Sequence, residues 1–303
     1  MSSRSRRSAA GPVLALVLAL ALGALVAAAS EAARRRPPSA QATALPIVAD
    51  ESTAAAHEMI NELKGLYGGD DSYALIDGFR YDITFTIPGP EGAPVRSWTE
   101  AHYIWMQGPP RARIDVDEDS TIVIVSGDTT RVRRAGAWIN DPVLVKAARA
   151  QALDALWTWH LPRNLANPAI RARQLDPTVN GQPFTTRFFY DHPGLERPPG
   201  TVLSVTFAPP TYAMRRLHWF DPRAKAWYLL ELADDKKRYG FTWAERRTLH
   251  ASDAAGEAGP VLWTAVVEDF QIEGHMPTIV LSPPDAGIGV VAARAAADTI
   301  ARR

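Results

Sequence analysis

The sequence predicts a mainly β fold with a few helices, of the α+β class, in which an antiparallel sheet carries helices on one side. Three observations support this prediction. Apolar and polar residues alternate along many short stretches, turn signals recur at roughly 10-residue intervals, and helical periodicity is confined to the start and the middle of the folded region. No repeat of fixed period is present, which argues against a propeller or a solenoid.

The first segment of the chain, residues 1–29, is predicted to be an export signal. Arg6 and Arg7 precede an apolar stretch at 11–29 that consists almost wholly of Ala, Leu and Val. Small residues at its end, such as Ala29, suit cleavage, but the stretch also has about the 17 to 25 residues that cross a bilayer. A cleaved signal peptide and an uncleaved membrane anchor both stay open. Either predicts an exported, periplasmic protein, soluble after cleavage or tethered to the inner membrane through residues 11–29.

The remaining boundaries follow from composition. Residues 30–50 are rich in Pro, Ser, Ala and Thr and have few bulky side chains, which predicts a disordered linker. The folded β domain is expected at 51–284. After Pro283-Pro284, residues 285–303 form an Ala- and Arg-rich C-terminal tail.

Helical periodicity begins at Ser52, and Gly68-Gly69 is expected to end this helix. A second short helix is expected through Leu75-Ile76. In the middle of the chain, Asp141-Pro142 opens a helix that Pro162 is expected to stop, and this helix is expected to lie across the sheet. The stripe of the first helix consists of Ala55, Met59, Leu63 and Leu66, with Ile60 and Tyr67 beside it.

Alternation with a period of two predicts the strands. Between Phe79 and Ile87, aromatic and aliphatic residues occupy one face, and Arg, Asp and Thr occupy the other. Asn180-Gly181 is a strong hairpin signal. The alternation over 237–243 predicts one strand with Tyr239, Phe241 and Trp243 together. Further strands are expected at 98–106, 112–116, 121–125, 184–190, 202–207, 217–220, 227–232 and 261–272.

Composition excludes several kinds of partner and chemistry. The chain has 33 Lys plus Arg and 33 Asp plus Glu, so no net charge attracts nucleic acid or anionic lipid. Cysteine is absent, which removes disulfides, thiolate catalysis, zinc–thiolate sites and a lipid anchor on cysteine. We therefore expect no nucleic-acid partner and no lipoprotein anchor.

The motifs that carry catalysis or bind metals are incomplete. The seven histidines are scattered singly, without the i, i+4 spacing of a metal site. Asp115, Asp117 and Asp119 have the spacing of the first calcium ligands of an EF-hand, but Ser120 and Ser126 replace its glycine and its glutamate. We interpret the three aspartates as the solvated end of a hairpin. No catalytic residue, cofactor or metal ligand is assigned.

A glycine pattern near the C-terminus also lacks its context. Gly287, Gly289 and Ala292 match the G-x-G-x-x-A form of a dinucleotide fingerprint. Too few residues follow for a βαβ unit, so we interpret the match as a coincidence.

The order of these elements resembles the LolA/LolB-like superfamily of envelope lipoprotein carriers, over roughly residues 51–284. The resemblance implies a curved antiparallel half-barrel sheet capped by helices, whose concave apolar face holds acyl chains and which has no catalytic residues. The stretches that carry it are His57-Glu58-Met59-Ile60 through Gly68-Gly69, Leu156-Trp157 to Pro162, Asn180-Gly181-Gln182-Pro183, and Phe220-Asp221-Pro222 leading to Trp227-Tyr228-Leu229-Leu230.

The nine tryptophans supply candidates for the wall of such a cavity, because aromatic side chains bury large apolar areas. The leading hypothesis is a non-enzymatic protein that binds lipid or lipoprotein acyl chains. One alternative is a non-catalytic envelope assembly module with a filled interior, and another is a hydrolase whose residues converge only in the fold. The side chains expected to line the cavity are Trp105, Trp138, Trp157, Phe188, Trp219 and Trp243.

Overall fold

The computed structural model describes residues 51–276, apart from 68, 90–92, 168, 176–182 and 192–196. The expected export signal, linker, C-terminal tail and glycine pattern near the C-terminus lie outside these residues, as does Asn180-Gly181. The predictions made for them therefore remain predictions.

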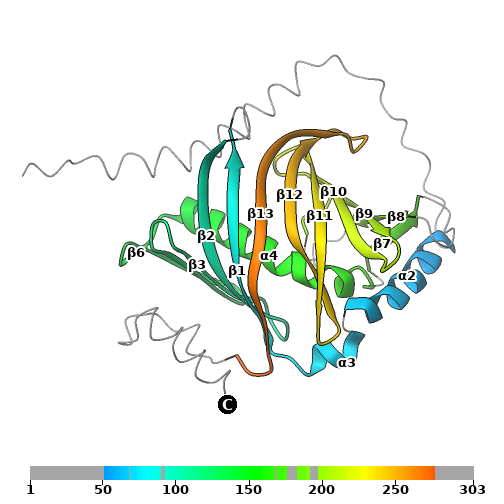
Figure 1. Cartoon of the computed structure of the whole chain (residues 1–303), viewed down its shortest axis with the longest axis horizontal. Coiled ribbons are helices and arrows are strands. Elements are labelled where there is room, and N and C mark those ends of the chain that lie inside the picture. Colours follow the sequence, from blue (N-terminus) through cyan, green and yellow to red (C-terminus); the bar gives the residue numbers. More distant parts are fainter. Residues whose placement is uncertain are drawn as a thin grey trace, which may run out of the picture. The chain divides into compact units, whose positions relative to one another are not determined.

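The described residues form one antiparallel sheet of thirteen strands (Figure 1). Their order is β6-β5-β4-β3-β2-β1-β13-β12-β11-β10-β9-β8-β7, so β6 and β7 are the two edges and the sheet is open. The first six strands are β1 (Gly78–Pro88), β2 (Pro94–Trp105), β3 (Arg111–Val116), β4 (Thr121–Ser126), β5 (Thr129–Arg134) and β6 (Ala137–Ile139). The others are β7 (Arg171–Gln174), β8 (Phe184–Tyr190), β9 (Thr201–Ala208), β10 (Ala213–Asp221), β11 (Ala226–Arg238), β12 (Phe241–Ser252) and β13 (Ala258–Glu273).

The first and last strands of the chain join the two halves of the sheet. Gly78 of β1 pairs with Glu273 of β13, and the register continues to Thr86 opposite Thr264. The predicted alternation of β1 is confirmed, because Phe79, Tyr81 and Ile83 are buried in one cluster. A pairing between residues so distant in sequence places β2–β6 on one side of β1 and β7–β12 on the other side of β13.

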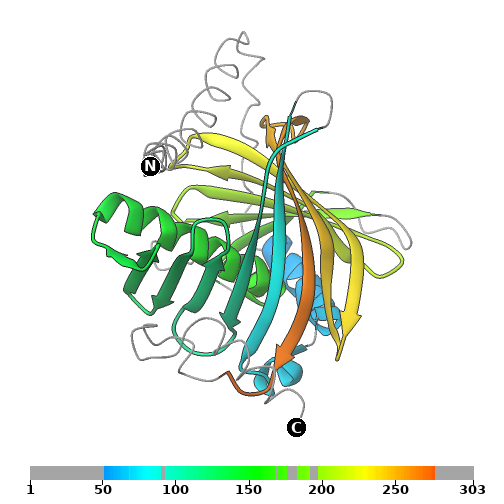
Figure 2. The same cartoon turned by 60° about the vertical axis from the view of Figure 1, so that its left-hand side comes forward.

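Three α-helices accompany the described part of the sheet: α2 (Glu51–Lys64), α3 (Gly69–Ala74) and α4 (Pro142–Asn164), with a 3-10 turn η1 (Gly65–Tyr67) between the first two. Figure 2 shows the sheet bending around α4. Asp141 caps α4 by accepting hydrogen bonds from the backbone N–H groups of Val143 (2.8 Å) and Leu144 (3.5 Å). The predicted central helix and its start are thereby confirmed.

The predicted end of the central helix at Pro162 is wrong, because α4 continues to Asn164. A proline removes one backbone N–H donor, but it interrupts a helix less when only one turn remains. The last turn is held by Leu161 and Leu165, which are fully buried and whose backbones are joined by a 3.0 Å hydrogen bond. Burial of these two leucines therefore outweighs the helix-breaking effect of the proline.

Two apolar clusters fill the space between α4 and the sheet. The first contains Leu156 and Trp159 of α4 together with side chains of β1, β3, β4, β12 and β13. The second contains Trp157 and Leu161 of α4 together with side chains of α2 and β7 to β12. One helix therefore packs against both halves of the sheet with two different sets of side chains.

The single strand predicted over 237–243 is wrong. The structure has a hairpin, in which β11 ends at Arg238, Tyr239 and Gly240 form the turn, and β12 begins at Phe241. Both turn residues have positive φ, 48° and 87°, as a two-residue hairpin turn requires. Tyr239 is consequently 75% exposed, whereas Phe241 is buried.

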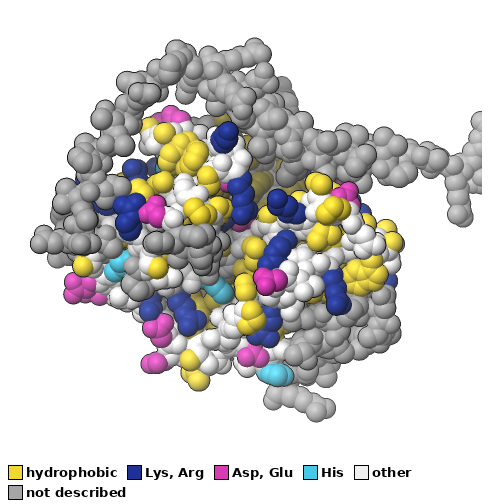
Figure 3. All heavy atoms as spheres, turned by 180° about the vertical axis from the view of Figure 1, so that it is seen from behind, with side chains coloured by type: hydrophobic (Ala, Val, Ile, Leu, Met, Phe, Trp, Pro, Cys, Tyr) yellow, Lys and Arg dark blue, Asp and Glu magenta, His cyan; other side chains and the backbone are white. Residues whose placement is uncertain are grey.

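The surface seen from behind shows basic and acidic side chains interspersed, with small apolar areas between them (Figure 3). This mixture agrees with the equal numbers of positive and negative residues. Within the described part of the chain, no helix has both the length and the hydrophobicity that a bilayer span requires.

Candidate functional site

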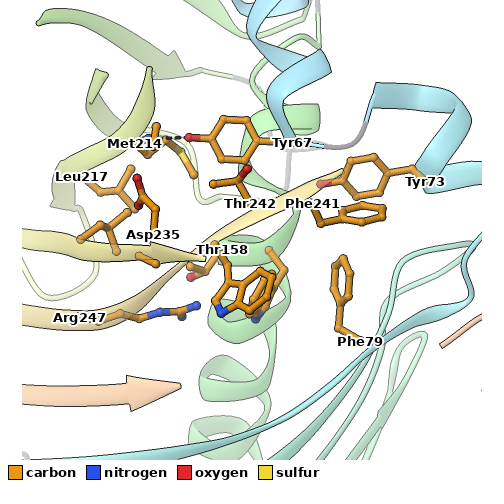
Figure 4. A pocket seen from close by; sticks show the side chains of 15 residues that line it. Tyr67, Tyr73, Phe79, Thr158, Met214, Leu217, Asp235, Phe241, Thr242 and Arg247 are labelled. Atoms are coloured by element: carbon orange, nitrogen blue, oxygen red, sulfur yellow. Dashed lines mark hydrogen bonds between the residues drawn. The ribbon is translucent and has the colours of Figure 1, made fainter. Parts of the chain in front are cut away.

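The inner face of the sheet and α4 enclose a recess whose walls are largely aromatic (Figure 4). Tyr67 of η1 and Tyr73 of α3 form one wall, and Thr158 and Trp159 of α4 form another. The strands contribute Phe79 from β1, Ala213, Met214 and Leu217 from β10, Leu232 and Asp235 from β11, and Phe241, Thr242, Trp243, Ala244 and Arg247 from β12.

Side chains nearly fill this recess in the observed conformation. The cavity inside it measures about 40 Å³. A cavity of about 10 to 15 Å³ on this measure holds one water molecule, whereas pockets for small organic ligands measure about 300 to 1,000 Å³. The recess therefore has space for a few water molecules, and a larger ligand enters only when its walls separate.

The aromatic walls are mutually packed. Phe79 lies 5.1 Å from Trp159 and 5.2 Å from Phe241, measured between ring centroids, and Trp243 stacks on Phe270 at 4.0 Å. The separations of Phe79 from Trp159 and from Phe241 are those at which aromatic pairs attract beyond their burial of area. These contacts connect α4 to strands from both halves of the sheet, so the aromatic cluster stabilises the closed recess.

Two tyrosines fix the wall formed by η1 and α3. The backbone N–H of Met214 donates to the hydroxyl oxygen of Tyr67 (2.5 Å), an interaction drawn in Figure 4. Gln107 donates to the backbone carbonyl of Tyr73. Burial raises the pKa of Tyr67, and burial also raises the pKa of Tyr73 to about 12. Both hydroxyls are therefore neutral at physiological pH.

Arg247 is a buried cation in the wall of the recess. Its side chain comes from β12 and points toward α4 (Figure 4), where its guanidinium lies 5.2 Å from the ring centroid of Trp159. The residue is 9% exposed, and its Nε has no hydrogen-bond partner. Among the described residues, no carboxylate forms an ion pair with it. Burial lowers the pKa of Arg247, yet a guanidinium stays protonated in proteins.

Asp235, the acidic residue in the wall, is neutralised by another arginine. Arg215 approaches both carboxylate oxygens of Asp235, each at 2.7 Å, in a bidentate pair. Since both tyrosines of the recess are neutral, the positive charge of Arg247 is not compensated within the recess.

A second buried polar group lies beyond the recess, on β1 and β2. The Tyr81 hydroxyl is 2.9 Å from Nδ1 of His102, whose Nε2 is 2.8 Å from Glu100. Burial raises the pKa of Glu100, but hydrogen bonds from His102, Trp98 and Gln151 outweigh it and hold that pKa below its usual value. The ionised Glu100 accepts from Nε2–H, and Nδ1 accepts from the phenol.

This carboxylate–imidazole–hydroxyl order is that of a hydrolase triad, with a tyrosine in place of the serine. Tyr81 is 1% exposed and does not line the recess. Its hydroxyl therefore has no path to a substrate in this conformation, and we interpret the three residues as a structural network that fixes the imidazole tautomer.

The interpretation of Asp115 as part of a solvated hairpin end is wrong. Asp115 is 6% exposed and receives two hydrogen bonds from the guanidinium of Arg113, at 2.7 and 2.8 Å. Asp119 does lie in the turn between β3 and β4, where it accepts from the backbone N–H of Thr121. The described residues contain no group of three or more His, Cys, Asp or Glu placed to hold a metal ion.

The five tryptophans and one phenylalanine predicted to line a cavity are not gathered in one place. Trp243 lines the recess, and Trp157 and Phe188 are buried in the cluster between α4 and β7–β12, against which Trp219 packs. Trp105 is buried with Tyr103 and Met276 in a separate cluster, and Trp138 is half-buried on the edge strand β6.

Sequence reasoning missed Arg247, although a signal for it was present. The alternation that places Phe241 and Trp243 on one face of the strand continues to Leu249, and Arg247 has the same parity. This signal is weak, because Glu245 has the same parity and is also charged.

The fold and the recess define a class of protein: an open antiparallel sheet bent around one helix, with an apolar interior. No family model matches the sequence, and no curated protein matches it. Solved structures, in contrast, do match the fold of this chain. A LolA superfamily protein from Nitrosomonas europaea superposes with a TM-score of 0.51 at 9% identity, covering 76% of this chain and 99% of that chain. This likeness shows that the protein has a LolA-like fold.

Two further structures are similar at lower scores. A DUF1329 family protein from Desulfovibrio piger has a TM-score of 0.49 at 10% identity and covers 78% of this chain and 99% of its own. A putative outer membrane lipoprotein-sorting protein domain from Vibrio parahaemolyticus has a TM-score of 0.47 at 12% identity and covers 75% of this chain and 97% of its own.

Proposed function

We propose that this protein is a non-enzymatic envelope protein that binds the acyl chain of a lipid or lipoprotein between α4 and the sheet. The observation that carries the proposal is the aromatic recess at this position in a LolA-like fold. The resemblance to envelope lipoprotein carriers implies the same ligand. In this proposal the bent sheet acts as a half-barrel, with α4 as the helix that covers its contents.

The energetics of such binding are favourable even though the recess is closed. Burying a methylene group yields about 0.8 kcal/mol, so an acyl chain of about 16 carbons yields about 12 kcal/mol before any cost is subtracted. The cost is the separation of α4, or of η1 and α3, from the strands. Ligands shift proteins toward conformations that bind them better, and the free energy of chain burial is large enough to offset the loss of several aromatic contacts.

The proposed path of the chain begins at the recess and follows α4. Trp243 contacts the ligand first, and Trp157, Phe188 and Trp219 come into contact as α4 moves away from β7–β10. We place Trp105 and Trp138 outside this path, because they belong to neither of the two clusters under α4.

Native purification tests the proposal. The full chain, purified without denaturant and extracted with organic solvent, is expected to release lipid that mass spectrometry identifies. Delipidated protein is expected to change its tryptophan fluorescence when hexadecanoic acid is added, and Trp243→Phe reduces that change more than Trp138→Phe, the matched control away from the recess. Absence of lipid together with unchanged fluorescence would contradict acyl-chain binding.

One observation favours a second function, a non-catalytic assembly module in the envelope. The recess is nearly filled, as is expected of a sheet that supports a protein-binding surface. Two of the exposed large apolar side chains, Val261 and Val266, share strand β13. The others lie on separate segments and are Leu75, Val95, Val143, Leu175 and Tyr239. Single exposed apolar residues are ordinary. The assembly function would be preferred if the native extract contains no lipid and the protein instead copurifies with a defined envelope protein.

A further inference from the structure

Arg247 has apolar cross-strand neighbours on both sides in its row of the sheet. On the neighbouring strands it is opposite Leu232 of β11 and Ala265 of β13, and Ala265 is in turn opposite Phe85 of β1. The row across four strands is therefore apolar except for one guanidinium. Removing a charge from water is costly unless a partner compensates for it.

The contacts of Arg247 compensate for this charge only in part. The face of Trp159 attracts the guanidinium as a cation–π pair. The Trp159 ring does not accept hydrogen bonds from the N–H groups in the plane of the guanidinium. Among the described side chains, none accepts a hydrogen bond from Arg247. The neighbouring carboxylate, Asp235, is held by Arg215. The buried Nε–H of Arg247 thus has no acceptor, and no described carboxylate pairs with its guanidinium.

Buried polar groups without partners are rare in proteins and point to a ligand or a functional constraint. The guanidinium presents its donors in a planar fork that matches the two oxygens of a carboxylate or phosphate. Aromatic side chains that match a hydrocarbon tail line the same recess, namely Phe79, Phe241 and Trp243. One end of the recess therefore suits an anion and the rest suits an alkyl chain.

We infer that the ligand is an anionic amphiphile whose carboxylate or phosphate pairs with Arg247 while its hydrocarbon tail lies against the aromatic walls. This inference rests on the proposed acyl-chain binding and adds the charge of the headgroup to it. The guanidinium supplies specificity, since a neutral lipid leaves it unpaired inside the protein.

Three ligands with the same tail test the inference: hexadecanoic acid, hexadecyl phosphate and 1-hexadecanol. They are titrated below their aggregation concentrations into the delipidated full chain, and binding is followed by tryptophan fluorescence and native mass spectrometry. The acid or the phosphate is expected to bind about ten-fold or more tightly than the alcohol, since hydrogen bonds to charged groups contribute at least that factor. Whichever anion binds more tightly identifies the headgroup class.

Substitutions on one strand separate the headgroup from the tail. Arg247→Met is expected to abolish the preference for the anions and to leave the affinity for 1-hexadecanol unchanged. Arg246→Met is the matched control, because Arg246 is the adjacent residue, its side chain is 69% exposed and it pairs with Asp234 outside the recess. The control variant is expected to keep the full preference.

The outcomes distinguish the two proposals. If the wild-type protein binds none of the three ligands, acyl-chain binding itself fails. If it binds the alcohol as tightly as the anions, or if Arg247→Met keeps the preference, the headgroup inference is overturned while acyl-chain binding stands.

Discussion

Replacing Arg247 by methionine is expected to stabilise the protein, which is unusual for a buried position. Methionine is apolar and flexible, so it replaces the aliphatic part of the arginine side chain beside Leu232 and Ala265 and removes the guanidinium from the face of Trp159. The substitution removes a charge that has no anionic partner among the described residues. A residue retained at the expense of stability is what a binding site predicts.

The size of the effect follows from two opposing contributions. Burying an unpaired ion costs several kcal/mol after relaxation of the protein, and a desolvated cation–π contact returns about 2 kcal/mol. Since Arg247 is 9% exposed, most of that cost applies. We therefore expect Arg247→Met to raise the free energy of unfolding by about 2 kcal/mol, which raises Tm by about 4 to 8 °C in a domain of 150 to 250 residues.

Urea unfolding of the ligand-free protein measures this change, with thermal unfolding as the second assay. Arg113→Met provides the control, because Arg113 is also buried but forms two hydrogen bonds with Asp115. Its removal leaves an unpaired buried carboxylate and is expected to cost about 3 kcal/mol. The two substitutions are chemically identical and have opposite predicted signs.

The reasoning would be refuted by a loss of about 1 kcal/mol or more in Arg247→Met. Such a loss means that the guanidinium has a stabilising partner in the folded protein, and a binding role is then unnecessary to explain its burial.

Two further predictions concern other buried groups. Glu100→Gln is expected to lower the free energy of unfolding by about 2 kcal/mol at pH 7, because the amide cannot accept all the hydrogen bonds that Glu100 accepts. Since the pKa of Glu100 is lowered in the folded protein, its contribution to stability is present above its unfolded pKa and is lost as the pH falls through the folded pKa. Equal urea midpoints of variant and wild type at pH 7 would contradict the network. Burial lowers the pKa of His160 from 6.5 to about 4. Between these two pKa values the unfolded state binds a proton that the folded state does not, so the free energy of unfolding decreases as the pH falls through this range, by up to about 3 kcal/mol. His160→Gln is expected to lose less stability than wild type between pH 7 and pH 4.5, and an identical loss in both proteins would count against this assignment.

Local patterns in the sequence were sufficient for the fold class. The alternation from Phe79 to Ile87 and the cap at Asp141 depend on residues within one strand or one helical turn, and both were confirmed. The element order also led to the LolA-like fold, which the comparison with the Nitrosomonas europaea structure supports at only 9% identity. Fold is encoded by such repeated local preferences, so it survives when individual residues do not.

Alternation does not reveal where a strand turns or which of its faces is inside. The pattern over 237–243 runs through the turn at Tyr239 and Gly240 without a break, although the pairing of Arg238 with Phe241 puts residues of opposite parity on one face of the two strands. Ile104 and Trp105 are both buried, but on different faces of β2 and in different clusters. The predicted cavity residues were chosen for being aromatic, which does not separate these two environments.

The sequence by itself determined that this chain forms an antiparallel sheet with a helix across it, since strand and helix periods are read from neighbouring residues. Only the tertiary structure decided which charges inside that sheet have partners. Asp115 is matched by Arg113 two residues away, a pairing that the alternation permits but does not require. Arg247 is surrounded by residues from β11, β13 and α4, and the absence of an anion among them follows from the packing of segments distant in sequence.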